Sequence, residues 1–153
     1  MKVFVLLAED PTSCNSVIVK FSTSYGRLVH EAWAAADLAP DLLSCDYLPG
    51  GYWMTKMEYL DPQDGWICVC DLKGQDASQA ASAILEALKV AHSCLPGGVH
   101  GDLRAANMLV RRKPMTETGL SPEGIWEVRF IDFEVCQLGG VASFVLLWLK
   151  LLW

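Results

Sequence analysis

The sequence predicts an α+β fold, with a mainly antiparallel sheet in the first half and a long helix and two strands in the second. Short apolar runs separated by turn residues fill the first 72 positions, with room for one helix between them. An apolar stripe with helical spacing then extends through 76–94. The 153 residues are 52% hydrophobic and 20% charged, which is typical of one packed domain, or part of a larger one, rather than of a disordered chain.

Five strands are expected before the long helix, each an aliphatic or β-branched run bounded by turn residues. Their bounds are 2–8, 16–21, 42–47, 52–60 and 66–72. The first two are expected to form an antiparallel hairpin with a long connecting loop. The turn at 49–51, Pro-Gly-Gly, joins the third strand to the fourth, and the breaker run Asp-Pro-Gln-Asp-Gly at 61–65 precedes the fifth.

A short helix is expected between the second and third strands. The hydroxyl side chains of 22–24 are good N-cap groups. Val29, Trp33 and Ala36 then follow at the spacing of one helical face. Pro40 is expected to end the helix, because a proline disfavours helical backbone in the residue before it.

The second helix, at 76–94, is the clearest element of the chain. Asp76 and Gln79 stand three residues apart, as the two members of a capping box do. Its apolar stripe consists of Ile84, Leu88, Ala91 and Leu95. The run Pro-Gly-Gly at 96–98 then stops the helix.

Two further strands, 108–111 and 126–131, are expected on either side of a polar loop at 113–124. The last segment, 141–153, is nearly all apolar, with Lys150 as its one charge. It is shorter than the roughly 20 residues that span a bilayer as a helix. A buried helix or a partner-binding segment is therefore expected rather than a membrane anchor, and exposed apolar surface there would lead to self-association.

Charge and cysteine content narrow the function classes. The net charge is −6 and the basic cluster 111–113 has no counterpart elsewhere, so nucleic-acid binding has little electrostatic support. The N-terminal apolar run is short and ends in two acids, unlike a secretory signal, so the six cysteines are expected to be free thiols in the cytoplasm. Cys68 and Cys70 are explained by alternation on a strand, since no second Cys/His pair stands at zinc-site spacing.

Residues 100–107, His-Gly-Asp-Leu-Arg-Ala-Ala-Asn, concentrate the side chains that phosphoryl transfer needs. That reaction requires nucleotide phosphates to be held, Mg²⁺ to be placed and an accepting hydroxyl to be oriented. Mg²⁺ prefers oxygen ligands such as carboxylates and amides. The alternative explanation is a polar loop that caps a helix and happens to contain these residues.

This segment resembles the catalytic loop of protein kinases, with Gly101 where that loop usually has Arg. The His-Gly-Asp form is familiar from small-molecule kinases and other atypical kinases of the same fold. The resemblance implies that Asp102 accepts or orients the proton of the acceptor hydroxyl. It also implies that Asn107 binds Mg²⁺ and that Arg104 offsets charge on the transferred phosphoryl group.

Two more segments are similar to kinase motifs. Asp132-Phe133-Glu134 resembles the metal-binding Asp-Phe-Gly, with Glu in place of Gly, and implies Asp132 as a metal ligand. The run Val-Ile-Val-Lys at 17–20 resembles the strand that carries the phosphate-pairing lysine, here Lys20. Its acidic partner is then expected on the next helix, where Glu31 is the candidate. The alternative is that Glu31 faces solvent.

The segment 57–60, Met-Glu-Tyr-Leu, resembles the kinase hinge, and its place between Lys20 and the loop at 100–107 gives it weight. The resemblance implies that Met57 is the gatekeeper. It also implies that the backbone groups of Glu58 and Leu60 pair with the adenine edge of ATP.

Residues 1 to about 136 together resemble the fungal kinase-like proteins, which are related to protein kinases and to aminoglycoside and choline kinases. This protein-kinase-like fold implies part of a small lobe at 1–60, a hinge and the start of a helical large lobe at 61–140, and an apolar tail at 141–153. The family's Gly-rich phosphate loop is missing before the Lys20 strand, and the sequence stops soon after Asp132. The resemblance therefore implies a fold that is incomplete at both ends.

Two functions of different classes follow from the resemblance. The first is an ATP- and Mg²⁺-dependent phosphotransferase that moves the γ-phosphoryl group to a hydroxyl of a protein or small molecule, with the activity of this chain weak or lost. The second is a non-catalytic kinase-like module that binds nucleotide or a protein partner. The presence of Lys20, Asp102, Asn107 and Asp132 favours the first, and the missing segments favour the second. The acceptor stays open.

Overall fold

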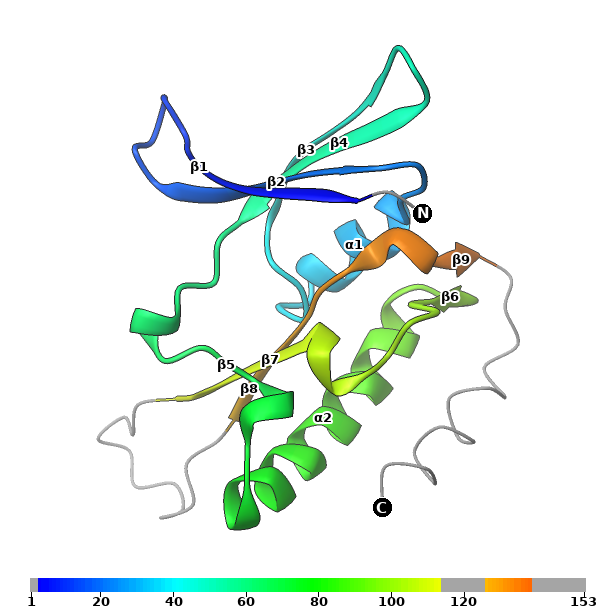
Figure 1. Cartoon of the computed structure of the whole chain (residues 1–153). Helices are drawn as coiled ribbons and strands as arrows, with labels where there is room; N and C mark the ends of the chain where they lie inside the picture. The colour runs from blue at the N-terminus through cyan, green and yellow to red at the C-terminus, as the bar shows by residue number, and fades with distance from the viewer. Residues whose placement is uncertain (1–2, 114–125, 139–153) are drawn as a thin grey trace.

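A four-stranded antiparallel sheet with the strand order β1-β2-β4-β3 forms the first part of the computed structural model, which describes residues 3–113 and 126–138 (Figure 1). Helix α1 lies between this sheet and the second part of the structure. The elements are β1 Phe4–Glu9, β2 Ser16–Ser22, α1 Arg27–Ala34, β3 Leu42–Leu48 and β4 Tyr52–Glu58. The predicted hairpin of the first two strands is confirmed.

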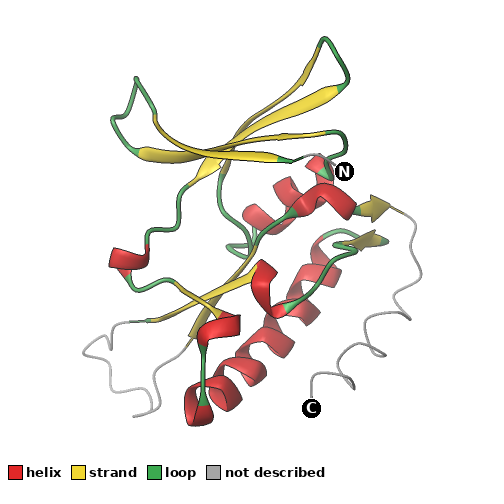
Figure 2. Ribbon diagram, in the orientation of Figure 1, coloured by secondary structure: helices red, strands yellow, loops and turns green. Residues whose placement is uncertain are grey.

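The second part packs the long helix α2 along a small antiparallel sheet with the order β5-β7-β8 (Figure 2). Its main elements are β5 Ile67–Cys68, α2 Gly74–Cys94, β7 Met108–Arg112 and β8 Trp126–Phe130. A two-stranded ladder joins β6 Gly98–Val99 to β9 Gln137–Leu138. The described residues also form short 3₁₀ helices, namely η1 Pro62–Asp64, η2 Val69–Asp71, η3 Ala105–Asn107 and η4 Phe133–Val135.

The core lies where α1, α2 and β8 meet, and Trp33 is at its centre. The Trp33 side chain is fully buried and packs edge-on against Phe130, with the ring centroids 5.1 Å apart. The predicted stripe of α2 supplies the facing surface, because Ile84, Leu88 and Ala91 are all buried. Leu95 lies just beyond the helix and is only partly buried.

The ends of both helices differ from the expectation. Helix α1 stops at Ala34, well before Pro40, because the backbone of Asp37 turns into the left-handed region at φ 57°. Its N-cap is Gly26 rather than a hydroxyl residue of 22–24, and no side chain caps it. Helix α2 begins at Gly74, so the expected capping box does not form; the Asp76 carboxylate instead accepts a hydrogen bond from Arg112 at 2.5 Å.

The strand expected at 66–72 is also wrong over most of its length. Pairing with β7 ends after Cys68, and the 3₁₀ turn η2 begins at Val69. The backbone N–H of Cys70 then donates to the Cys68 sulfur at 3.4 Å, which places both cysteines on a tight turn rather than on alternating faces of a strand. All six cysteines are free thiols, as expected.

Two expectations fall outside the described residues, namely the apolar tail at 141–153 and most of the polar loop at 113–124. Among the helices in the described part of the chain, none has both the length and the apolar character needed to cross a membrane.

Replacing Trp33 by Ala is expected to lower the free energy of unfolding by about 3–5 kcal/mol, because it leaves a cavity at the centre of the core. Leu28→Ala on the same helix is the matched control, since Leu28 is 55% exposed and should change stability by less than about 1 kcal/mol. Urea unfolding followed by tryptophan fluorescence and circular dichroism measures both changes. Equal effects of the two substitutions would contradict this description of the core.

Candidate active site

A cavity of about 310 Å³ opens between the four-stranded sheet and β7. Its apolar wall includes Val5 and Ile18 from the sheet and Leu109 from β7, and the connecting segment 57–60 lines it as well. Its polar lining includes Lys20, Asn107, Asp132 and Glu134. The volume lies within the usual range of small-molecule sites. The lining suits a ligand with a flat apolar part and a charged part.

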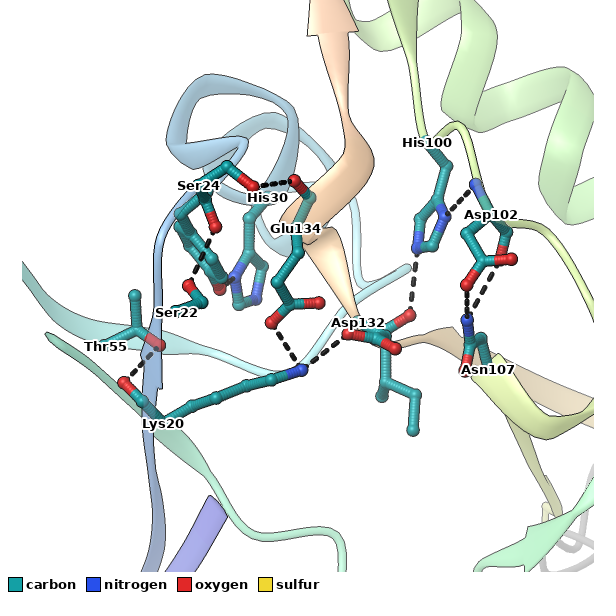
Figure 3. Close-up of polar contacts among 12 residues, drawn as sticks. Lys20, Ser22, Ser24, His30, Thr55, His100, Asp102, Asn107, Asp132 and Glu134 are labelled. Atoms are coloured by element: carbon teal, nitrogen blue, oxygen red, sulfur yellow. Dashed lines mark hydrogen bonds and ion pairs between the residues drawn. The ribbon is translucent and has the colours of Figure 1, made fainter. Parts of the chain in front are cut away.

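Lys20 crosses from the sheet to the second part of the structure (Figure 3). Pairing of β2 with its neighbours places Lys20 between Val5 and Thr55, and its side chain is only 11% exposed. The ammonium group donates to Oδ1 of Asp132 at 2.5 Å and forms a second ion pair with Glu134. The lysine predicted from sequence therefore meets the acid predicted from the 132–134 motif.

The expected pairing of Lys20 with Glu31 is wrong. Glu31 accepts a hydrogen bond from Arg27 one helical turn earlier, at 2.7 Å, and its side chain is 42% exposed. The face of α1 that turns inward carries Val29, His30 and Trp33 instead. Glu31 is thus on the outer face of the helix, as the alternative held.

The loop 100–107 holds its polar side chains in one network. The Asn107 amide nitrogen donates to the backbone oxygen and to Oδ2 of Asp102, both at 3.0 Å. Arg104 approaches the same Asp102 oxygen at 3.3 Å and is itself mostly exposed. Both Asn107 bonds use the nitrogen, so they leave its Oδ1 as an oxygen ligand. The structure therefore brings Asp102, Arg104 and Asn107 together.

His100 fastens this loop to the 131–134 segment. It is fully buried, its Nε2–H donates to the carbonyl of Ile131 at 2.9 Å, and its Nδ1 accepts the N–H of Asp102 at 3.4 Å. Burial lowers the pKa of His100, which keeps the ring neutral and preserves these roles. The Ile131 N–H also donates to the Asn107 carbonyl at 3.0 Å, so side chain and backbone both join the two segments.

The backbone around residue 101 explains why the loop has glycine where the kinase loop usually has Arg. Its backbone has φ 80°, a conformation that side chains rarely adopt. A Cβ atom there would lie 2.3 Å from the carbonyl oxygen of Val135. Only glycine fits this position while the loop and the 133–135 turn stay in contact.

Asp132 and Phe133 form the junction between the site and the core. Asp132 adopts a left-handed backbone with φ 75°, which Asp tolerates better than most residues and which turns the chain into η4. Phe133 stacks on His30 with their ring centroids 4.3 Å apart and 1° between the ring planes. The Gly26 N–H donates to the Phe133 carbonyl at 2.8 Å, so the same turn also holds the start of α1.

The segment 57–60 borders the cavity with its backbone and with Met57, which is buried. The N–H of Glu58 is already used, because it donates to the carbonyl of Asp41 at 2.9 Å. The Glu58 side chain accepts from the N–H of Asp41 at 3.2 Å and so stabilises the same connection. The N–H of Glu58 is therefore not free to pair with a ligand in this structure.

No protein-family model and no curated protein matches the chain. Among solved structures, it is similar to the Cydia pomonella granulovirus kinase PK-1, with a TM-score of 0.59 and 15% sequence identity. The match covers 89% of this chain and 51% of that one, so the chain spans about half the length of the viral kinase. The chain has a protein-kinase-like fold. At 15% identity this similarity establishes the fold alone. Any statement about chemistry has to come from the residues of the site.

Several residues of this kinase-like cavity are missing from the sequence prediction. Val5 and Ile18 could have been found from strand alternation, since they lie on paired strands next to Lys20. Leu109 follows the loop 100–107 on the next strand and could have been found in the same way. The ion pair of Glu134 with Lys20 could not have been predicted, because in the motif comparison Glu134 is only a residue that replaces glycine.

The polar side chains of the cavity fit a divalent cation that prefers oxygen ligands, such as Mg²⁺. One ammonium, that of Lys20, faces the carboxylates of Asp132 and Glu134, so the cluster carries excess negative charge. Asp132 and Asn107 offer carboxylate and amide oxygens, which are the ligands that Mg²⁺ prefers. The all-oxygen, thiol-free character of these donors argues against a thiophilic metal at this position.

Acidification is expected to destabilise the fold through His30. Burial lowers the pKa of His30 from 6.5 to about 4, because the charged ring would lose its hydration, and this outweighs the hydrogen bond from Nε2–H to the Pro40 carbonyl at 2.7 Å, which favours the charged form. The Nδ1 atom accepts from the Tyr25 hydroxyl in the neutral ring. Between pH 6.5 and 4, His30 is therefore protonated in the unfolded chain and neutral in the folded chain. As the pH falls through this interval, the free energy of unfolding decreases by about 3 kcal/mol, whereas above pH 6.5 this effect is absent.

Urea unfolding at pH 7.0, 6.0 and 5.0 measures the effect. His30→Phe retains an aromatic ring over Phe133 but removes the titrating group, so its stability should depend less steeply on pH than that of the wild type, whatever its stability at pH 7. Identical slopes for the two proteins would contradict the neutral, buried state of His30.

Proposed function

We propose that this chain binds Mg-ATP in the cavity and belongs to the phosphotransferases that move the γ-phosphoryl group to a hydroxyl. The observation that carries the proposal is that Lys20, Asp132 and Asn107 line one mainly apolar cavity in a kinase-like fold, with Asp102 bonded to Asn107. The order of the motifs along the chain supports the same assignment. The amino-acid sequences of those motifs favour a relation to fungal kinase-like proteins. In this proposal 1–60 is small lobe, and 61–140 is hinge and the start of the large lobe.

The apolar part of the cavity would take the adenine ring between Val5 and Leu109. The carbonyl of Glu58 and the backbone of Leu60 would pair with the adenine edge, beside Met57 as gatekeeper. Lys20 would bind phosphate oxygens with its ammonium group. Asp132 and Asn107 would hold Mg²⁺, which, when bound, neutralises charge on the phosphates.

Asp102 would orient the acceptor hydroxyl and take its proton as the new bond forms between that oxygen and the γ-phosphorus. The bond from the γ-phosphorus to the bridging oxygen breaks in the same transfer, and ADP leaves with that electron pair. Arg104 would offset the charge on the moving phosphoryl group. Hydroxyls of proteins and of small molecules both satisfy this chemistry.

A second candidate function is nucleotide binding without transfer. The observation that favours it is the engagement of the Asp102 carboxylate, which already accepts from Asn107 and pairs with Arg104. An acceptor hydroxyl has to compete with both groups. Weak activity is therefore expected of this chain even if it binds Mg-ATP.

Mg-ATP is expected to raise the thermal midpoint of the chain. A ligand at 100 times its dissociation constant stabilises the fold by about 2.7 kcal/mol, which corresponds to roughly 5–10 °C for a chain of this size. Asp132→Ala should abolish the shift, whereas Asp64→Ala, an exposed acid outside the cavity, should retain it. An unshifted wild-type midpoint with Mg-ATP would remove both nucleotide proposals.

Consumption of ATP separates the two candidate functions. If the chain transfers phosphoryl groups, including to water, Asp102→Ala should reduce the rate at least ~10²-fold while the Mg-ATP thermal shift persists. Release of ADP from wild type and variant, measured with a coupled assay, provides the comparison. A thermal shift without any ADP release by the wild type would favour the non-catalytic module.

A further inference from the structure

Glu134 has a buried carboxylate with a single ionic partner among the described residues. Its side chain is 1% exposed and forms an ion pair with Lys20. Apart from this ion pair, neither carboxylate oxygen receives a hydrogen bond from the described part of the chain. A buried charge persists only when an opposite charge compensates it, so the position of Glu134 and the position of Lys20 depend on each other.

The backbone explains why a glutamate can stand where the related motif has glycine. The left-handed turn occurs at Asp132, two residues earlier, and Glu134 itself lies in the 3₁₀ helix η4 with a negative φ. The Ser24 hydroxyl donates to the Glu134 carbonyl at 2.7 Å (Figure 3). The turn is thereby fixed to the segment that leads into α1, and the Glu134 side chain is directed toward Lys20.

Helix α1 supplies no acid to this position. Its one acid, Glu31, lies on the outer face with Arg27, and the inward face is formed by Val29, His30 and Trp33. Within the part of the chain that the structure describes, Asp132 would be the one anion paired with Lys20 if Glu134 were absent.

We infer that Glu134 is the positioning residue that anchors Lys20 for the nucleotide phosphates, in place of an acid on helix α1. This inference rests on the proposed function, since phosphates must bind there for the anchoring to matter. When the Asp132 carboxylate binds a metal cation, Glu134 keeps the ammonium group of Lys20 in place. The anchor of the lysine and the metal-binding acid then lie on one turn, two residues apart.

A double-mutant cycle tests the inference. The proteins are the wild type, Glu134→Gln, Lys20→Met and the double variant, with Glu31→Gln for the alternative position and Glu86→Gln as an exposed control. Two quantities are measured for each: the thermal midpoint without ligand, and the dissociation constant of Mg-ATP by calorimetry. Each exchange of Glu for Gln keeps the shape of the side chain, so a change reports on charge.

Without ligand, Lys20→Met is expected to lower the midpoint more than the double variant does, because only the single change leaves the buried Glu134 carboxylate unpaired. With ligand, Glu134→Gln is expected to weaken Mg-ATP binding at least tenfold when Lys20 is present and less than threefold when it is added to the Lys20→Met variant. Glu31→Gln and Glu86→Gln should change neither quantity.

Three outcomes would overturn the inference. Additive midpoints in the cycle would show that Lys20 and Glu134 are not coupled. An equal loss of Mg-ATP affinity with and without the Lys20→Met change would make Glu134 a metal ligand instead. A larger loss of Mg-ATP affinity in Glu31→Gln than in Glu134→Gln would show that the acid on helix α1, and not Glu134, positions Lys20. If the wild type binds no Mg-ATP, the proposed function fails, and the ligand-free midpoints alone decide whether Glu134 anchors Lys20.

Discussion

The charge cluster of buried Lys20, buried Glu134 and partly exposed Asp132 is the interaction on which the rest of the site depends. It joins a strand of the first sheet to a turn that follows the last strand of the second sheet, 112 residues away in sequence. Taking the charges of Lys20 and Glu134 out of water is costly, and a well-packed apolar pair of the same size would be as stable or more so. The cluster is therefore better explained by what it can bind than by what it adds to the stability of the fold.

An aromatic cluster beneath these charges keeps them in register. Phe133 packs against both His30 and Trp33, and His100 packs against Trp33, with ring centroids 5.6 Å apart, and also against Phe133. Each histidine uses its ring face for packing and its nitrogens for directed hydrogen bonds. The core and the site are consequently one structure: the groups that exclude water from the centre of the molecule also determine where Asp102 and Asp132 lie.

Local sequence was sufficient for most of the elements and for the residues that meet at the site, because strand alternation, the α2 stripe and the motif spacings are short-range patterns. It failed where a distant contact decides the structure. Asp76 forms an ion pair with Arg112 instead of a capping box, and Lys20 pairs with Glu134 instead of Glu31. Spacing along the chain cannot show which of two acids reaches a lysine when the nearer one can turn toward an arginine on its own helix.

The close contact between Gly101 and the Val135 carbonyl limits which residue can occupy this position of the loop. An arginine, the usual residue there in the protein-kinase loop, is sterically barred by the path of the backbone. Introducing it by design would force apart the two segments that carry Asp102 and Asp132. A change toward the kinase motif would therefore disrupt the site rather than complete it.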